Sequence, residues 1–165
     1  MRKIGLLSDT HGFLDPRFFD LFSEVDEIWH AGDIGNGNVL TDLETFKPCR
    51  AVFGNIDDWE LRTRLTEHQR FECEGLRVWM THIGGYPGKY SPTVKNGLFQ
   101  NPPGLFISGH SHILKVMFDK NIGCLHINPG AAGRSGFHQM RTAVRFAIDN
   151  GEVKDLEVIE LGKRG

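Results

Sequence analysis

The sequence predicts an α/β fold in which two mixed sheets pack together with helices outside them. Three observations support this prediction. Strand-like and helix-like segments alternate in the first third of the chain, and turn-linked strands dominate the rest. Five apolar strands also end directly in a residue that can bind a metal. Strand–helix alternation is typical of a parallel sheet with right-handed crossovers, whereas hairpins add antiparallel strands.

The first elements follow from short apolar runs separated by helical patterns. Asp15 is expected to cap the first helix, with Pro16 at the first helical position, where proline is favoured. The predicted order is strand, helix, strand, helix, strand, at residues 3–8, 16–22, 26–31, 39–46 and 50–53.

The second half contains pairs of strands around turn residues. The pairs Glu74-Gly75 and Asn150-Gly151 and the segment 119–121 each lie between two apolar runs, and Asn-Gly is a strong hairpin signal. A glycine- and proline-rich loop at 84–92 is expected to lead into a short helix. The tail is expected to form a hairpin-rich meander. The predicted strands are 70–73, 76–81, 105–108, 113–118, 122–127, 141–148 and 153–161.

Length and composition limit the possible classes of protein. A chain of 165 residues, 24% of them charged, fits one globular domain spanning residues 1–165. The net charge of -2 gives no reason to expect a stable nucleic-acid partner. Cys49, Cys73 and Cys124 are too scattered for a disulfide framework or a cysteine zinc site.

The N-terminal apolar run is too short for a signal peptide, and no stretch reaches membrane-spanning length. We therefore expect a cytoplasmic protein with no membrane partner. The sequence is compatible with a homo-oligomer.

The metal-competent residues at the strand ends are the most informative pattern. In open α/β sheets, ligands gather at the carboxyl ends of strands, so these residues could converge on one crevice. They are Asp9 and His11, Asp33, Asn55, His82, and His110 and His112.

Seven nitrogen and oxygen donors are enough for two ions. If the carboxylate of Asp33 bridges the ions, each ion receives four protein ligands and keeps open positions, as catalytic sites require. Two ions about 3.5–4 Å apart can hold a phosphate and an activated water between them. Asp33, Asn55 and His82 are therefore the expected catalytic residues. Manganese is favoured, with iron, zinc, cobalt and nickel as alternatives.

The residues around the ligands agree with this interpretation. Gly32, Gly54 and Gly109 each directly precede a ligand, where a missing Cβ permits a tight bend. In extended chain, alternate residues point the same way, so both residues of an Asp-x-His or His-x-His pair are expected to reach one site.

Three further histidines have simpler expected roles. His30 is expected to be packed and hydrogen-bonded, and His68 to be solvated. For His126, packing and the support of a ligand stay open.

The ordered set of motifs resembles the calcineurin-like metallophosphoesterase family, and in particular its small stand-alone bacterial and archaeal phosphodiesterases. The matching segments are Asp9-Thr10-His11-Gly12, Gly32-Asp33, Gly54-Asn55-Ile56-Asp57, His82, Gly109-His110-Ser111-His112 and Ile127-Asn128-Pro129-Gly130.

This resemblance implies a four-layer α-β-β-α sandwich. It also implies that one ion is held by Asp9, His11, Asp33 and His112, and the other by Asp33, Asn55, His82 and His110. The implied reaction is the hydrolysis of a small phosphodiester by a metal-bridging hydroxide.

The chain departs from the family pattern at Ile56, where many members have a histidine that protonates the leaving oxygen. General acid catalysis typically contributes about 10²–10⁴-fold, so esters with poor leaving groups are expected to react slowly. The candidate replacements are Arg134 and His138, in the loop at 133–139, or a metal-bound water. Together with Asn55, Arg134 and His138 are the expected substrate-binding residues.

The alternative function is a protein-interaction scaffold with little or no catalysis. The retromer subunit that shares this fold also lacks the family histidine and works chiefly by binding partners. All seven metal ligands are retained here, and this favours the enzyme.

Overall fold

The computed structural model describes residues 1–36 and 38–165, which form two five-stranded sheets and one two-stranded ribbon. The first sheet contains, in spatial order, β12 (Glu152–Lys163), β11 (Met140–Asp149), β1 (Arg2–Leu7), β2 (Glu27–His30) and β3 (Cys49–Ala51). The second contains β4 (His68–Cys73), β5 (Leu76–Thr81), β8 (Leu105–Ile107), β10 (Cys124–Asn128) and β9 (Lys115–Asp119). The ribbon pairs β6 (Gly85–Tyr86) with β7 (Lys89–Tyr90).

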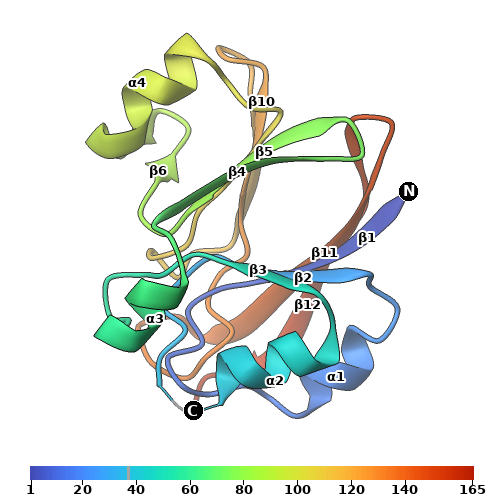
Figure 1. Cartoon of the computed structure of the whole chain (residues 1–165), viewed down its shortest axis with the longest axis vertical. Coiled ribbons are helices and arrows are strands. Elements are labelled where there is room, and N and C mark those ends of the chain that lie inside the picture. The colour runs from blue at the N-terminus through green and yellow to red at the C-terminus, as the bar shows by residue number, and fades with distance from the viewer. Residues whose placement is uncertain (37) are drawn as a thin grey trace.

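The helices cover the outer faces of the two sheets (Figure 1). Below the first sheet lie α1 (Arg17–Leu21) and α2 (Val39–Phe46), and α4 (Pro92–Gln100) lies beyond the second. A further short helix, α3 (Trp59–Arg64), follows β3. The predicted α-β-β-α order of four layers is confirmed.

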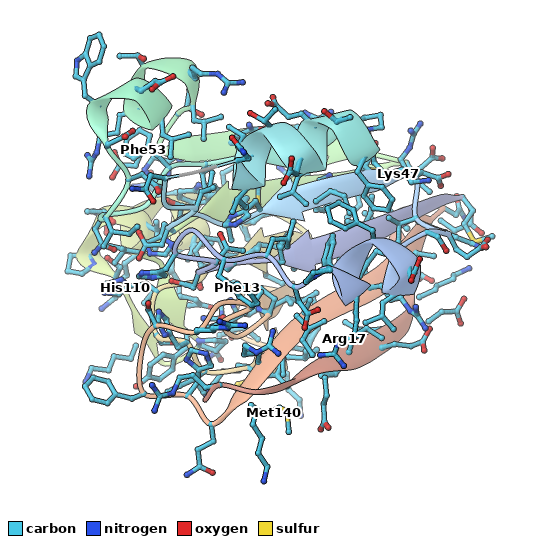
Figure 2. The ribbon with its side chains drawn as sticks, turned by 90° about the horizontal axis from the view of Figure 1, so that it is seen from below. Phe13, Arg17, Lys47, Phe53, His110 and Met140 are labelled. Atoms are coloured by element: carbon cyan, nitrogen blue, oxygen red, sulfur yellow. The ribbon has the colours of Figure 1, made fainter. Side chains whose placement is uncertain are left out.

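Both sheets are mixed, as predicted. In the first, β1 pairs in parallel with β2, and β2 with β3, while β11 runs antiparallel to β1. In the second, β8 pairs in parallel with both β5 and β10. The carboxyl ends of each parallel set therefore lie at one edge. Figure 2 shows Phe53 after β3 and His110 after β8 at the same end of the molecule, opposite Lys47, which precedes β3.

Apolar side chains explain why the layers stack. Leu6 and Trp29 of the first sheet meet Met80 and Ile107 of the second in a buried cluster between the sheets. A second cluster joins the first sheet to α1 and α2, and a third joins α4 to the second sheet. Helices α1, α2 and α4 thus each bury apolar side chains, which is what stabilises short helices in proteins.

The two predicted tight turns have the backbone that their residues favour. Glu74 and Gly75 have φ values of 49° and 82°, and Asn150 and Gly151 have 52° and 79°. Positive φ at both central residues is the requirement of a type I′ hairpin turn. The strands that they join, β4 with β5 and β11 with β12, are antiparallel.

Several predicted details are wrong. The tail is not one meander, because the β9–β10 hairpin belongs to the second sheet and the β11–β12 hairpin to the first. Helix α1 begins at Arg17, one residue later than predicted, although Pro16 has helical φ and ψ values of -56° and -28°. Asp15 accepts a hydrogen bond from the Arg17 amide at 2.9 Å. The short helix α3 and the β6–β7 ribbon were not predicted.

No helix within the described residues combines the length and the apolarity needed to cross a lipid bilayer.

Shortening a buried side chain of α4 should destabilise the protein. Leu98 is 0% exposed, and it packs in the cluster with Trp79 and Phe106. We expect Leu98→Ala to lower the free energy of unfolding by about 2–5 kcal/mol, because a cavity adds to the lost apolar burial. Phe99→Ala is the control on the same helix. Phe99 is 52% exposed, and its loss should cost less than about 1 kcal/mol. Urea denaturation measures the free energy of unfolding of both variants. Equal losses of stability would contradict the packing of α4 against the second sheet through Leu98.

Candidate metal centre

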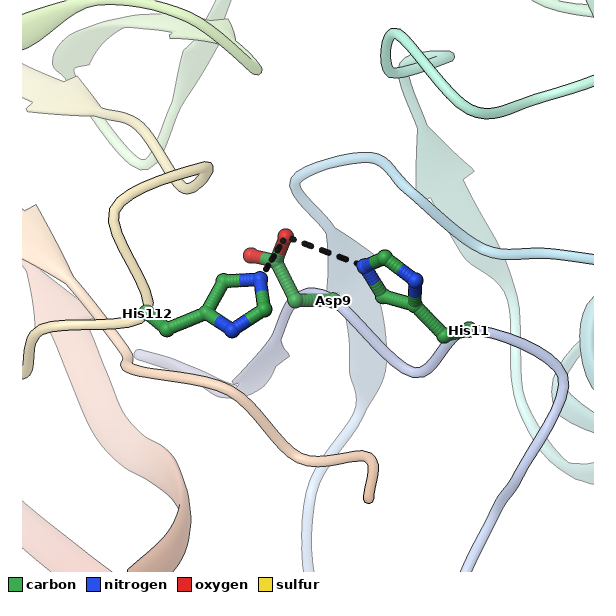
Figure 3. A group of neighbouring side chains, drawn as sticks. All are labelled: Asp9, His11 and His112. Carbon is green, nitrogen blue, oxygen red and sulfur yellow. Dashed lines mark ion pairs between the residues drawn. The ribbon is translucent and has the colours of Figure 1, made fainter. Parts of the chain in front are cut away.

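Two groups of metal-competent side chains meet where the carboxyl edges of the two sheets converge. Within each group, the candidate ligand atoms all lie within 4.8 Å of one another. Figure 3 shows the group formed by Asp9, His11 and His112, with the Asp9 carboxylate between the two imidazoles. The other group contains Asp33, His82 and His110.

The Asp33 carboxylate links the two groups. Its Oδ2 lies 3.4 Å from His11 Nε2 and 3.1 Å from His82 Nε2, so it faces one histidine of each group. Asp9 Oδ1 lies 3.1 Å from His112 Nε2 and 3.8 Å from the Nε2 atoms of His11 and His82. This is the geometry expected if Asp33 is shared between two ions.

Asn55 lies at the open side of the second group. Its Oδ1 is 3.0 Å from His110 Nδ1, and the residue is exposed. The seven residues predicted as ligands are thus gathered at one place. As expected, His110 and His112 belong to different groups.

The backbone brings these side chains together in a different way from the one predicted. Asp9, His11, Asp33, His110 and His112 have positive φ values of 56°, 48°, 54°, 71° and 63°. The Asp-x-His and His-x-His pairs are therefore not in extended chain, and the prediction based on side-chain alternation is wrong. The left-handed region costs a residue other than glycine about 1 kcal/mol or more, and such strain is concentrated at functional sites.

Backbone hydrogen bonds between the loops hold this conformation. The amides of Asp9 and His11 donate to the carbonyls of Gly32 and Asp33, each at 3.0 Å. The Gly109 amide donates to the His82 carbonyl at 2.9 Å. These bonds join the end of β1 to the end of β2, and the end of β8 to the end of β5. The joined segments all carry ligand residues.

All three glycines that precede ligands are required by close packing. A Cβ at Gly32, whose φ is 101°, would collide with the side chain of His82. A Cβ at Gly54 would collide with the backbone nitrogen and carboxylate of Asp33, and one at Gly109 would collide with the side chains of Ser8 and Asp9. These contacts confirm the predicted close approach of the backbone.

Asp57 holds the loops that carry Asp33 and Asn55. Its carboxylate accepts hydrogen bonds from the amides of Gly35 at 2.8 Å, Gly54 at 2.7 Å and Ile34 at 3.3 Å. The residue is 4% exposed. A buried carboxylate with three amide donors is a stable hydrogen-bond centre, so Asp57 supports the site without lying in either ligand group.

Asn128 supports the loop that carries His110 and His112. Its Nδ2 donates to the Gly109 carbonyl at 3.0 Å and lies 3.1 Å from Ser111 Oγ. Sequence reasoning gave Asn128 no such role. It is the last residue of β10, at the carboxyl end of a largely apolar strand, and that signal could have identified it.

His82 is oriented by the main chain. Its Nδ1 lies 2.8 Å from the Ala31 carbonyl, so Nδ1–H donates to that carbonyl and Nε2 points at the Asp33 and Asp9 carboxylates, where it could bind a metal. A carbonyl partner on the distant ring nitrogen is typical of metal-binding histidines.

The electrostatics of the site favour charged carboxylates. Burial opposes ionisation of Asp9, but the His11 and His112 imidazoles outweigh it and hold the pKa of Asp9 well below its usual range. Asp33 behaves in the same way, since His82 lowers its pKa against the effect of burial. The interaction with Asp9 raises the pKa of His11. The centre therefore holds two negative charges that a cation can neutralise.

The unpaired atoms fit bound metal. Among the described residues, Asp9 Oδ1, His11 Nε2 and His82 Nε2 are buried and have no hydrogen-bond partner. Unsatisfied buried polar atoms are costly, and a cation among them would satisfy all three. Carboxylate oxygens and imidazole nitrogens are also the ligands that first-row divalent metals accept.

Two of the predicted substrate-binding residues, His138 and Arg134, have different surroundings. The ring of His138 packs against that of His112, with centroids 5.2 Å apart, and its Nε2 lies 2.7 Å from the Gly133 carbonyl. The guanidinium of Arg134 is exposed and stacks on Phe13 at 3.8 Å. A role for either in substrate binding stays a prediction.

The remaining histidines are structural. His30 is 0% exposed and lies 3.0 Å from Thr10 Oγ1, and burial lowers its pKa to about 3. His126 is also packed, at 1% exposure. His68 is half-buried and accepts a hydrogen bond from the Trp79 indole at 3.1 Å, so the prediction of a solvated residue is wrong.

Comparisons with known proteins agree with this geometry. Residues 2–151 match the family model of the calcineurin-like phosphoesterase superfamily domain. A probable metallophosphoesterase from Methanothermobacter thermautotrophicus is 31% identical over 96% of this chain and 92% of its own. Another from Methanocaldococcus jannaschii is 30% identical over 78% of this chain and 67% of its own.

Solved structures share the fold at lower identity. A Vps29 variant from Entamoeba histolytica superposes with a TM-score of 0.75 at 16% identity, covering 97% of this chain and 99% of its own. A novel archaeal phosphodiesterase superposes with a TM-score of 0.73 at 20% identity, covering 96% and 99%.

Removing the charge of Asp33 should weaken metal binding in both groups. Because its Oδ2 faces a histidine of each group, we expect Asp33→Asn to lower the occupancy of both ions. Asp42→Asn, an exposed change on α2, is the control. Metal analysis of dialysed protein by inductively coupled plasma mass spectrometry measures the bound ions. Full occupancy of both sites in the Asp33 variant would defeat the shared-ligand assignment.

Proposed function

We propose that this chain, which belongs to the calcineurin-like phosphoesterase superfamily, is a binuclear metal-dependent phosphodiesterase acting on small substrates. The observation that carries the proposal is the position of Asp33 Oδ2, 3.4 Å from His11 Nε2 and 3.1 Å from His82 Nε2. One shared carboxylate between two ligand groups is the arrangement of two-metal hydrolases. Manganese is the proposed metal because carboxylate and amide oxygens suit it, and the imidazole ligands leave iron, zinc, cobalt and nickel as alternatives.

The two ions would supply Lewis acidity, neutralising charge on the phosphoryl oxygens and lowering the pKa of a coordinated water. The role of the protein is to hold the donors rigidly. The five strained residues and the hydrogen bonds between their loops fix the ligand atoms before substrate arrives. Such preorganisation is the usual main source of electrostatic catalysis.

The side chains provide no better nucleophile than water. Burial raises the pKa of both Cys49 and Cys124 to about 12, so these thiols are protonated at neutral pH and unreactive. We propose that Asn55, an exposed residue at the open side of the second group, contacts a phosphoryl oxygen.

The site lacks the histidine that protonates the leaving oxygen in many members of the family. Ile56 is 44% exposed and cannot donate a proton. We propose that His138, whose ring packs on His112, contacts the substrate, and that Arg134 does so from the same loop. Diesters with acidic leaving groups should react fastest, because they need no proton donor.

A second candidate function is protein interaction. The similarity to Vps29 shows the fold alone, but the edge strand β9 exposes Val116, Met117 and Phe118 at 42%, 46% and 54%. Exposed apolar strand edges are common sites of association. The intact set of metal ligands favours the enzyme. Cytoplasmic residence and a homo-oligomer stay predictions.

Hydrolysis of a synthetic diester separates the two functions. With manganese, we expect turnover of bis(p-nitrophenyl) phosphate, little turnover of p-nitrophenyl phosphate, and loss of both on chelation. His82→Ala should reduce the diester rate at least about 100-fold, because it removes an oriented ligand. Asp42→Asn, an exposed change on α2, is the control. Absence of turnover with any divalent metal would favour the interaction protein.

Phosphate should bind only when metal is present. The Asp9 and Asp33 carboxylates are both ionised at neutral pH, because nearby histidines lower their pKa values. They repel an anion unless cations neutralise them. Isothermal titration calorimetry should therefore detect inorganic phosphate binding to manganese-loaded protein and none after chelation. Equal binding by metal-free protein would contradict the role of the ions.

A further inference from the structure

Two small cavities flank the two ligand groups. The first, here called the His11 cavity, has a volume of about 280 Å³ and is lined by His11, Gly35, Asn36, Ile56, Asp58 and Ser135. The second, here called the His82 cavity, has about 150 Å³, and its wall includes Asn55, Arg62, Glu67 and His82. A phosphodiester has two ester arms, and the centre has one cavity on each side.

The His11 cavity lies directly against the shared carboxylate. The Ile56 amide donates to Asp33 Oδ1 at 3.0 Å, and His11 Nε2 lies 3.4 Å from Asp33 Oδ2. Both residues also line the cavity. A phosphoryl group held at the centre would therefore extend one of its ester arms along Ile56 and into this cavity.

Among the described residues that line the His11 cavity, Asp58 supplies the one carboxylate. Asp58 is exposed, and its carboxylate caps α3 by accepting a hydrogen bond from the Leu61 amide at 3.0 Å. Within residues 1–36 and 38–165, no lysine or arginine lines this cavity. Arg134 precedes the lining residue Ser135, but its guanidinium is stacked on Phe13.

The His82 cavity offers no free cation either. Arg62 lines it, but its guanidinium donates to the carbonyls of Asp57 at 2.8 Å, Asn55 at 3.1 Å and Gly54 at 3.3 Å. Glu67 adds a carboxylate to the same wall. An ester arm that carries a further phosphate would meet carboxylates on both sides, and among the described residues that line the two cavities it would find no free guanidinium or ammonium group.

We propose that the His11 cavity binds a cationic ester arm, an amino alcohol of the choline or ethanolamine type. The 44% exposed side chain of Ile56 contacts the methylene and methyl groups, and the Asp58 carboxylate attracts the ammonium. This assignment rests on the proposed function, of which it names the substrate class. An exposed ion pair contributes about 0.2–1 kcal/mol, so the preference is a few-fold.

The test compares two phosphates of the same shape. Phosphocholine carries a quaternary ammonium, and 3,3-dimethylbutyl phosphate replaces that nitrogen with carbon. Titration calorimetry on manganese-loaded protein should show about threefold tighter binding of phosphocholine. Asp58→Asn should remove the difference, because asparagine caps a helix as well as aspartate does but has no charge. Glu60→Gln, an exposed change on α3 outside the cavity, should leave the difference in affinity between the two phosphates unchanged.

Three results would overturn the proposal. The unchanged protein could bind phosphocholine no more tightly than 3,3-dimethylbutyl phosphate, or the preference for phosphocholine could survive Asp58→Asn. The third result is a protein that binds inorganic phosphate but neither of the two organic phosphates. A preference that declines in 1 M salt would support it, because salt screens exposed charges. Failure to hydrolyse any diester, with the charge preference intact, would contradict the proposed hydrolysis and still support the charge of the cavity.

Discussion

The contact between Asp33 and histidines of both ligand groups is the interaction on which the site depends. Asp9 and Asp33 are almost completely buried, at 0% and 2% exposure. Buried carboxylates are stable only when other groups offset their charge. The imidazoles of His11, His82 and His112 do so in part, and the unpaired ligand atoms leave a place for cations. The surrounding structure is arranged to keep these like charges a few ångströms apart.

That arrangement comes from the two sheets. The parallel strands of each sheet end at one edge, and the apolar cluster between the sheets holds the two edges together. Asp57 and Asn128 then fix the loops, each through a buried side chain that bonds to main-chain groups. The strained backbone of the ligand residues is supported by these contacts, as strained conformations at functional sites require.

The sequence predicted the elements better than their connections. The helix at 39–46 and the strand at 76–81 were predicted with the observed limits, because their apolar patterns are regular. The distribution of the last two hairpins between the sheets was missed, because strand pairing depends on contacts between distant residues. The short helix α3 has no buried residue, so it carries no apolar periodicity that could identify it.

The identity of the seven candidate ligands was readable from the sequence alone, because each follows an apolar strand at its carboxyl end. Only the tertiary structure decided how they meet. The left-handed backbone at Asp9, His11 and Asp33 places their side chains, and local sequence does not specify that conformation for residues other than glycine. The cavity formed by His11, Ile56 and Asp58 likewise exists only because loops far apart in the chain lie side by side. Residue type thus determined the chemistry, and long-range packing determined its geometry.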